Sequence, residues 1–336
     1  MSKPLIVYYE EFAPLSLTEI ALAKKASENA DLLLLIKDNK KGVSFDDVSA
    51  MIRLAFEEEG IAYSLLKEKD MNSLLESKRA KPIFFLLDED NKKDLEFRSF
   101  LKDSQFETIS AGKFIPKNQM RSERDSGALS SLDLHSSTIR YISDHDLFYC
   151  KQVKRYLNDH RYAHSKSVAL LSLDIALNNH LSFYNKVYVA ALLHDIGKNV
   201  DLDSSRALMK KDYRDYLSYP SWSYHQFVSA IIAKENFSIE DNDELDAICY
   251  HCTGKAKMNP IGKIVYTADK IDPLRGWNSS VYIEGAKKDY EKGFIRLLKA
   301  NRDFLKEKDK EEKIPLSEEC YEYYLKERKE NVSKDC

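Results

Sequence analysis

The chain of 336 residues has no apolar run that approaches the roughly 20 residues needed to cross a bilayer. It has only 10 glycines and 8 prolines, with 43% hydrophobic and 32% charged residues, which excludes a disordered or low-complexity protein. A net charge of −3 gives no general attraction to nucleic acid. The first residues lack the basic and then apolar pattern of a secretory signal. We therefore expect a cytoplasmic globular protein without DNA, RNA or membrane partners.

Cysteine is also scarce. The five cysteines are odd in number and scattered, so they do not form a disulfide framework. Cys249 and Cys252 have the spacing of half a zinc ribbon, but no second pair completes a four-ligand site.

The length favours two domains, and the patterns place the boundary at residue 145. Residues 1–145 alternate strand-like and helix-like segments. The strand candidates are 4–9, 31–38, 80–90 and 106–111, and the helix candidates are 15–30, 44–60 and 92–103, followed by a Ser-rich loop at 120–133. Apolar strands separated by helices are typical of a parallel sheet, so we expect a Rossmann-like α/β domain.

Residues 146–336 show no strand signals. Apolar residues recur there at intervals of three and four, which predicts an all-α domain. The helical segments are 147–160, 165–180, 183–198, 224–236, 242–251, 261–271 and 283–308.

Imidazole and carboxylate side chains interrupt these apolar helical segments. The residues are His164, His194, Asp195, His225, His251 and Asp269. Such a set suits a divalent iron, manganese or zinc ion. His194 and Asp195 would project about 100° apart on one helical turn, so one metal could take both, or two metals could share the aspartate.

Each residue also has a simpler interpretation. A single histidine on an apolar helix is more often a hydrogen-bonded core residue, and Asp269 could be a buried ion-paired carboxylate. His160 and His164 have the HxxxH spacing of zinc proteases, but Arg161 replaces the glutamate that serves there as general base. The remaining histidines, which have polar surroundings, are predicted to lie on the surface: His135, His145 and His180.

The order of the set is more specific than its members: one histidine, a His-Asp pair, two further histidines and an aspartate. Together with RYAHS, ALLHDIGK, YHCTG and IVYTADKIDPLRG, this order makes residues 147–330 resemble the YqeK-type hydrolases of the HD superfamily. The resemblance implies symmetrical cleavage of diadenosine tetraphosphate into two ADP. It also implies bound iron, with manganese or another divalent ion as a substitute. The sequence leaves the oligomeric state open, with a homodimer as one alternative.

The resemblance implies two metal positions. One would be held by His164, His194, Asp195 and Asp269, and the second by His225 and His251 with Asp195 as a bridge. A bound divalent ion lowers the pKa of a water molecule from about 15.7 toward 7 and neutralises phosphate charge. Asp195 and Lys198 are therefore the predicted catalytic residues.

Four residues, Lys198 among them, are predicted to contact the substrate. Lys198 lies four positions after His194, on the same face of a helix. There its ammonium group could bind phosphate, or it could be a solvated residue that interacts favourably with the helix dipole. Thr253 and Gly254 could present backbone N–H groups to phosphate, although Gly254 also suits a helix C-cap. Arg275 is a second phosphate contact.

An aromatic residue beside the predicted site, Trp222 or Tyr224, could stack on a base. Aromatic residues in helices are more often part of the core, so this is the weaker prediction.

The first domain has its own resemblance, in HSSTIRYI at residues 135–142. It resembles the SSTxIR element of nicotinate mononucleotide adenylyltransferases, in which a Ser/Thr-rich turn and an arginine at a helix start bind the triphosphate of ATP. In some mycoplasma-type chains such a domain precedes a YqeK-type domain.

The other half of that motif is different here. Ser16 and Glu19 stand where the HxGH histidines belong, and Thr18 replaces the glycine. Glu10 and Glu11 place negative charge where phosphate would sit. We therefore expect a degenerate, inactive adenylyltransferase-like domain. Two alternatives remain open: an active adenylyltransferase that serves NAD synthesis, and a non-catalytic nucleotide-sensing scaffold.

Overall fold

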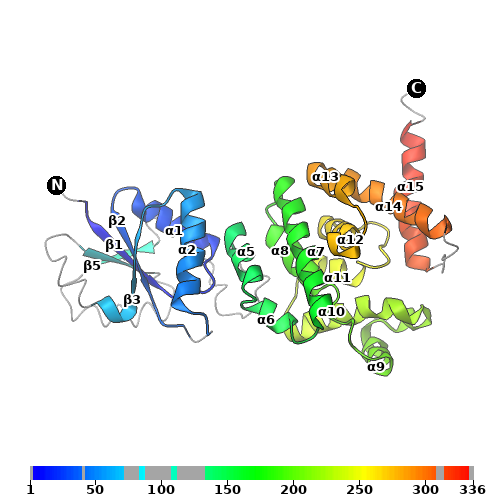
Figure 1. Ribbon diagram of the computed structural model, residues 1–336, viewed down its shortest axis with the longest axis horizontal. Coiled ribbons are helices and arrows are strands. Elements are labelled where there is room, and N and C mark those ends of the chain that lie inside the picture. Colours follow the sequence, from blue (N-terminus) through cyan, green and yellow to red (C-terminus); the bar gives the residue numbers. More distant parts are fainter. Residues whose placement is uncertain are drawn as a thin grey trace. The chain divides into compact units, whose positions relative to one another are not determined.

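The structure is a computed structural model that describes residues 3–39, 42–71, 83–87, 107–111, 133–307 and 314–332 (Figure 1). The described residues up to Phe148 belong to one compact unit and those from Tyr149 onward to another. The helix predicted at 92–103 and the loop predicted at 120–132 lie outside the described residues. Within them, no helix is both long and apolar enough to cross a membrane.

A parallel five-stranded sheet forms the centre of the first unit, in the order β3-β2-β1-β4-β5. Its strands are β1 (Leu5–Glu10), β2 (Asp31–Ile36), β3 (Ser64–Lys67), β4 (Ile83–Leu87) and β5 (Glu107–Ser110). The predicted Rossmann-like α/β class is confirmed. Sequence patterns missed β3, because this edge strand is only four residues long and is half-exposed, so it lacks a continuous apolar run.

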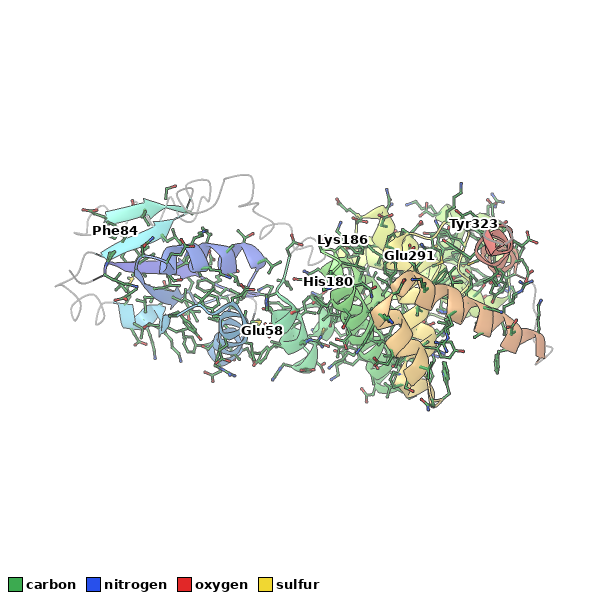
Figure 2. The ribbon with its side chains drawn as sticks, turned by 90° about the horizontal axis from the view of Figure 1, so that it is seen from above. Glu58, Phe84, His180, Lys186, Glu291 and Tyr323 are labelled. Atoms are coloured by element: carbon green, nitrogen blue, oxygen red, sulfur yellow. The ribbon has the colours of Figure 1, made fainter. Side chains whose placement is uncertain are left out.

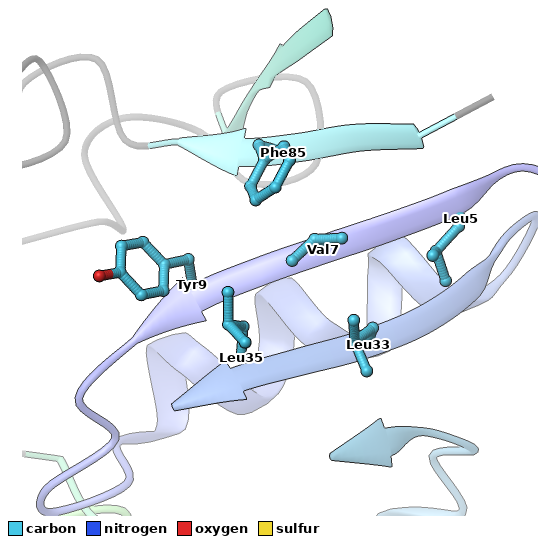
Figure 3. Close-up of a cluster of buried hydrophobic side chains, with 6 residues drawn as sticks. All are labelled: Leu5, Val7, Tyr9, Leu33, Leu35 and Phe85. Carbon is cyan, nitrogen blue, oxygen red and sulfur yellow. The ribbon is translucent and has the colours of Figure 1, made fainter. Parts of the chain in front are cut away.

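One face of the sheet carries a compact apolar cluster (Figure 3). Because side chains alternate along a strand, every second residue of β1 points to the same side. The cluster consists of Leu5, Val7, Tyr9, Leu33, Leu35 and Phe85. All six β1 side chains are buried, so both faces of this strand are covered, as expected in a parallel sheet.

Helix α1 (Leu17–Ser27) begins with a capping box. The Ser16 N–H donates to Glu19 Oε2 at 2.6 Å, and the Glu19 N–H donates to Ser16 Oγ at 3.3 Å. This pair satisfies backbone donors at the helix start, which typically contributes about 1 kcal/mol. The two positions that would carry the adenylyltransferase histidines therefore serve here as helix caps.

Helix α5 (Ser136–Asp144) begins within the Ser/Thr-rich element, where the sequence predicts a helix start. His135 is its N-cap, and the prediction that this histidine lies on the surface is wrong. Its Nδ1 pairs with Ser137 Oγ at 2.7 Å, and its Nε2 lies 3.8 Å from carboxylates of α2 (Phe45–Glu59), so packing against α2 buries the ring. His145 and His180 are exposed, as predicted. Figure 2 labels His180, which follows α7.

The second unit consists of helices and 3-10 turns in its described part, as expected. Its helices are α6 (Tyr149–Val153), α7 (Asp159–Asn178), α8 (Tyr184–Leu193), α9 (Leu202–Asp212), α10 (Tyr224–Phe237), α11 (Asn242–Cys249), α12 (Pro260–Ile271), α13 (Ser280–Lys288), α14 (Tyr290–Glu307) and α15 (Pro315–Val332). Helices α7 and α8 run side by side, and α12 packs against both (Figure 1). Helix α11 contacts α8, α10 and α12, so these five helices surround a common interior.

The single helix predicted at 283–308 is divided into α13 and α14, which is a correction. The backbone is extended at Asp289, between the two helices. Asn179, at the end of α7, stabilises the break: its Nδ2 donates to the carbonyls of Ala286 and Lys287, and its Oδ1 accepts from the Tyr290 N–H. Apolar periodicity continues through the break, so it did not reveal this tertiary contact.

Glu244, in the first turn of α11, is a fully buried carboxyl group. Neither of its side-chain oxygens has a hydrogen-bond partner among the described residues. Burial raises the pKa of Glu244 to about 8, with Asp241 adding to the increase and Lys186 opposing it. The neutral acid is therefore the form that the fold favours.

We predict that Glu244→Gln increases the free energy of unfolding at pH 8 by roughly 1–3 kcal/mol. The pKa of Glu244 is raised on folding, so its contribution to stability is complete below about pH 4.5 and is lost as the pH rises through about 8. Urea unfolding of wild type and variant should show that the substitution increases the free energy of unfolding more at pH 9 than at pH 6. The exposed Glu240→Gln change is the control, and a gain independent of pH would contradict the assignment.

Candidate metal centre

Five structural elements of the second unit bring the six predicted ligand residues together. His164 lies on α7, His194 and Asp195 directly follow α8, His225 lies in the first turn of α10, His251 follows α11 and Asp269 lies on α12. Five of these residues are at most 8% exposed, and the His164 side chain is 12% exposed. A buried group of this composition needs internal partners or an ion.

The His-Asp pair does not lie within a helix, which corrects the prediction. Helix α8 ends at Leu193, and His194 is its C-cap. The Ile196 N–H then bonds to the Leu193 carbonyl at 3.1 Å, and the Lys198 N–H to the Asp195 carbonyl at 2.9 Å, so the chain continues in tight i→i+3 turns. Lys198 therefore does not share a helical face with His194.

Gly197 explains why the chain can take this path. A Cβ at this position would lie 2.8 Å from Ser229 N and 2.9 Å from the His225 carbonyl oxygen, both backbone atoms of α10. The Gly197 N–H donates to Ser229 Oγ at 2.9 Å. Sequence reasoning missed this residue, although a lone glycine in an apolar helical pattern indicates close backbone approach.

Backbone carbonyls orient three of the histidine rings. In each case Nδ1 lies within hydrogen-bond distance of the carbonyl oxygen three residues earlier. The pairs are His194 with Ala191 at 2.6 Å, His225 with Trp222 at 2.7 Å and His251 with Ile248 at 2.7 Å. Because a carbonyl only accepts, Nδ1 carries the proton, which leaves each Nε2 available toward the centre.

A carboxylate orients the fourth ring. His164 Nδ1 lies 2.6 Å from Asp272 Oδ2, and the Ser167 hydroxyl donates to the other oxygen of this fully buried aspartate. Histidines that bind metals commonly donate their second N–H to a carboxylate in this way. Sequence reasoning missed Asp272. The sequence did contain a signal for its role: Asp272 is the second aspartate of ADKID and lies three residues after Asp269, on the same side of the helix end.

The first candidate ligand group is formed by His164, His194 and Asp269. Asp269 Oδ1 lies 3.1 Å from His164 Nε2 and 3.6 Å from His194 Nε2. The His194 Nε2 is buried and has no hydrogen-bond partner among the described residues, an orphaned acceptor that a metal ion would satisfy.

The second candidate ligand group is formed by His194, Asp195 and His251, and His225 lies beside it. Asp195 Oδ1 is 3.2 Å from His225 Nε2 and 3.5 Å from His251 Nε2, and these two nitrogens are 3.2 Å apart. The other oxygen, Oδ2, lies 3.9 Å from His194 Nε2, and His194 also belongs to the first group. The two oxygens of Asp195 thus lie near different histidines, an arrangement that allows one carboxylate to bridge two ions.

The protonation of the centre reflects these contacts. Burial works to lower the pKa of His225, but the hydrogen bond to Asp195 raises it to about 9. Burial lowers the pKa of His251 to about 3. Burial works to raise the pKa of Asp195, but the neighbouring His194, His225 and His251 hold it far below its usual range. Imidazole nitrogens and carboxylates arranged in this way fit a divalent metal, whose binding would release protons.

Two cations lie at the partly exposed edge of the centre. Lys198 Nζ is 3.0 Å from His225 Nε2 and 3.8 Å from Asp195 Oδ1, and its side chain is 35% exposed. The Arg275 guanidinium donates to the carboxylate and to the backbone carbonyl of Asp269, and its side chain is 41% exposed. Both predicted phosphate contacts therefore lie beside the predicted ligands.

The other two predicted phosphate contacts have no free backbone donor. The Thr253 N–H donates to Gln226 Oε1 at 3.3 Å, and the Gly254 N–H donates to the Tyr250 carbonyl at 2.8 Å. Gly254 has φ +68°, and a Cβ there would lie 2.8 Å from Cys320 Sγ, so its role is conformational. The predicted phosphate role of Thr253 and Gly254 is not supported by this geometry.

The structure also separates the two candidate base platforms. Tyr224 is only 4% exposed, and its hydroxyl donates to the Leu217 carbonyl, so it belongs to the core. Trp222 is 50% exposed.

Residues 161–274 match the family model described as HD domain. This segment is an HD domain. It includes all six predicted ligand residues as well as Asp272.

Two curated proteins are similar to part of this chain. The chain is 34% identical over 125 residues to a protein of Halalkalibacterium halodurans named bis(5'-nucleosyl)-tetraphosphatase, symmetrical, a match that covers 37% of this chain and 66% of the relative. It is 26% identical over 179 residues to a Mycoplasma genitalium protein named probable nicotinate-nucleotide adenylyltransferase/Ap4A hydrolase. That match covers 51% of each chain, so the chain spans about half the length of this relative.

A solved structure is also similar, a predicted HD superfamily hydrolase involved in NAD metabolism from Clostridium acetobutylicum. The sequence identity is 23% and the TM-score is 0.46, over 56% of this chain and 97% of the other.

We predict that Asp272→Ala weakens Mn²⁺ binding about 10- to 100-fold, because His164 loses the carboxylate that fixes its ring. Isothermal titration of the metal-free protein would measure the change, and Asp272→Asn should lose less affinity because it keeps an acceptor for Nδ1. Asp174→Asn is the matched control. Asp174 lies on α7, the helix that carries His164, and its carboxylate pairs with Lys287. Wild-type affinity in folded Asp272→Ala would argue against His164 as a ligand.

Proposed function

We propose that the HD domain is a divalent-metal-dependent phosphohydrolase that cleaves diadenosine tetraphosphate symmetrically into two ADP. The observation that carries the proposal is the arrangement of Asp195, whose Oδ1 lies near the Nε2 atoms of His225 and His251 and whose Oδ2 lies near the Nε2 of His194. The names of the similar proteins from Halalkalibacterium halodurans and Mycoplasma genitalium support the same substrate class.

We further propose two metal positions. His164, His194, Asp195 and Asp269 would hold one ion, while His225, His251 and the shared Asp195 would hold the other. Iron is the proposed resident metal, with manganese as a substitute, since imidazole and carboxylate ligands without thiolate suit both. Bound there, the ions would activate water for attack on phosphorus at neutral pH and neutralise charge on the phosphate oxygens.

The protein's own groups would position the phosphate chain. Lys198 and Arg275 would each bind non-bridging oxygens, one cation on the side of His225 and the other on the side of Asp269. Arg275 would exchange part of its contact with Asp269 for phosphate, and its planar guanidinium allows bidentate binding. Because phosphoryl transfer depends mainly on positioning and electrostatics, these fixed charges favour attack at a β-phosphorus and departure of ADP.

In the first unit, we propose that the adenylyltransferase-like fold has lost its activity. The capping box supports this, because Ser16 and Glu19 are both committed to the start of α1. Glu10 is buried near the end of β1, where a phosphate would meet its negative charge.

Purified protein loaded with Fe²⁺ or Mn²⁺ should convert diadenosine tetraphosphate to ADP as the sole nucleotide product, as measured by chromatography. Asp195→Ala should lose bound metal and lower kcat/KM by more than about 100-fold, because both ligand groups share this carboxylate. Asp203→Ala, at an exposed position on α9, should retain activity. AMP plus ATP as products, or full activity in Asp195→Ala, would contradict the proposal.

The first unit should release no pyrophosphate from ATP and nicotinate mononucleotide above the rate without enzyme, because it lacks the HxGH histidines that would stabilise the transition state. A coupled pyrophosphate assay on the full chain tests this, with an active adenylyltransferase as positive control. Pyrophosphate release that depends on both substrates would instead support the adenylyltransferase alternative.

A further inference from the structure

Both tryptophans of the chain are exposed, Trp222 to 50% and Trp277 to 41%. Tryptophan is highly buried on average, so an indole that presents this much apolar surface to water calls for an explanation. The two residues share one further property: each lies in a short segment that is hydrogen-bonded to a proposed metal ligand.

Trp222 lies in the 3-10 turn Ser221–Ser223, directly before α10. Its carbonyl lies 2.7 Å from the Nδ1 of His225. The N–H and hydroxyl of Ser223 donate to the Pro220 carbonyl at 2.9 Å and 2.8 Å, which fixes the turn. The indole is therefore carried by an ordered backbone one hydrogen bond away from the second ligand group.

Trp277 follows the 3-10 turn Pro273–Arg275 at the end of α12. Arg275 donates to Asp269 through its side chain, and its N–H donates to the Asp272 carbonyl at 3.0 Å. The Trp277 ring packs against Tyr282 of α13, with the ring centroids 5.6 Å apart and the planes at 68°. This indole thus packs against α13 and lies two residues after the arginine that contacts Asp269.

Two of the proposed metal ligands, His225 and Asp269, have the same kinds of residue connected to them. Lys198 contacts His225, and the backbone carbonyl of Trp222 is bonded to the same histidine. Arg275 contacts Asp269, and Trp277 lies two residues further along the chain. Each of these ligands is therefore linked to a partly exposed cation and to an exposed tryptophan close in sequence.

We propose that Trp222 and Trp277 are the stacking platforms for the two bases of a dinucleoside polyphosphate. This inference rests on the proposed function, and it names what recognises the ends of the substrate. The substrate carries one base at each end of a polyphosphate, which matches two exposed indoles, each linked through the chain to a cation that contacts a proposed metal ligand. Stacking on indole is favourable for any base and adds to the charge contacts with phosphate.

The two tryptophans allow a direct binding test, because each single Trp→Phe variant leaves one indole as the fluorescent reporter. ADP should quench Trp222 in Trp277→Phe and Trp277 in Trp222→Phe, whereas inorganic tripolyphosphate, which has no base, should quench neither. A reporter that does not respond to ADP, or that responds equally to tripolyphosphate, would overturn the platform at that position. This readout needs no turnover, so it is independent of whether diadenosine tetraphosphate is hydrolysed.

Kinetics provide the second measurement. Trp222→Ala and Trp277→Ala should each raise the KM for diadenosine tetraphosphate roughly tenfold or more, with kcat changed by less than about threefold, because the bases lie away from the reacting phosphorus. Phe304→Ala removes a similarly exposed aromatic ring from α14 and should leave both parameters unchanged. Variants that fold normally and keep the wild-type KM would overturn the proposal.

Discussion

The Asp195 carboxylate is the interaction on which the rest of the centre depends. It is 8% exposed and lies within 4 Å of the Nε2 atoms of His194, His225 and His251. A buried carboxylate is costly unless it is paired, and here three imidazoles supply the pairing. The helices that carry these rings must therefore converge on one point, which constrains the packing of the whole HD domain.

Backbone constraints produce that convergence. Gly197 lets the chain after Asp195 pass against α10, and carbonyls three residues earlier hold His194, His225 and His251 in orientation. These acceptors belong to the main chain, so the arrangement does not depend on flexible side chains. Asp272 supplies the same function for His164. These protein contacts direct the Nε2 atoms inward, which reduces the reorganisation that metal binding would require.

The sequence predicts the fold class, and the six candidate ligand residues that it indicates lie close together in the structure, because apolar periodicity and the order of His and Asp positions are local signals. Predictions from the sequence were wrong where a tertiary contact determines where a helix ends or which acceptor a backbone N–H binds. The end of α8 before His194 depends on packing at Gly197, and the break before α14 depends on Asn179. The N–H groups of Thr253 and Gly254 were assigned to phosphate, since nothing local indicates that Gln226 and Tyr250 accept them.

The central claim, that Asp195 is shared by two ligand groups, is tested most directly by the metal stoichiometry of the reconstituted protein. After loading with Mn²⁺ and removal of excess metal, elemental analysis together with electron paramagnetic resonance should find two ions per chain with a spin-coupled signal. Retention of one uncoupled ion per chain at saturation, or of two coupled ions in Asp195→Ala, would contradict the shared-carboxylate account.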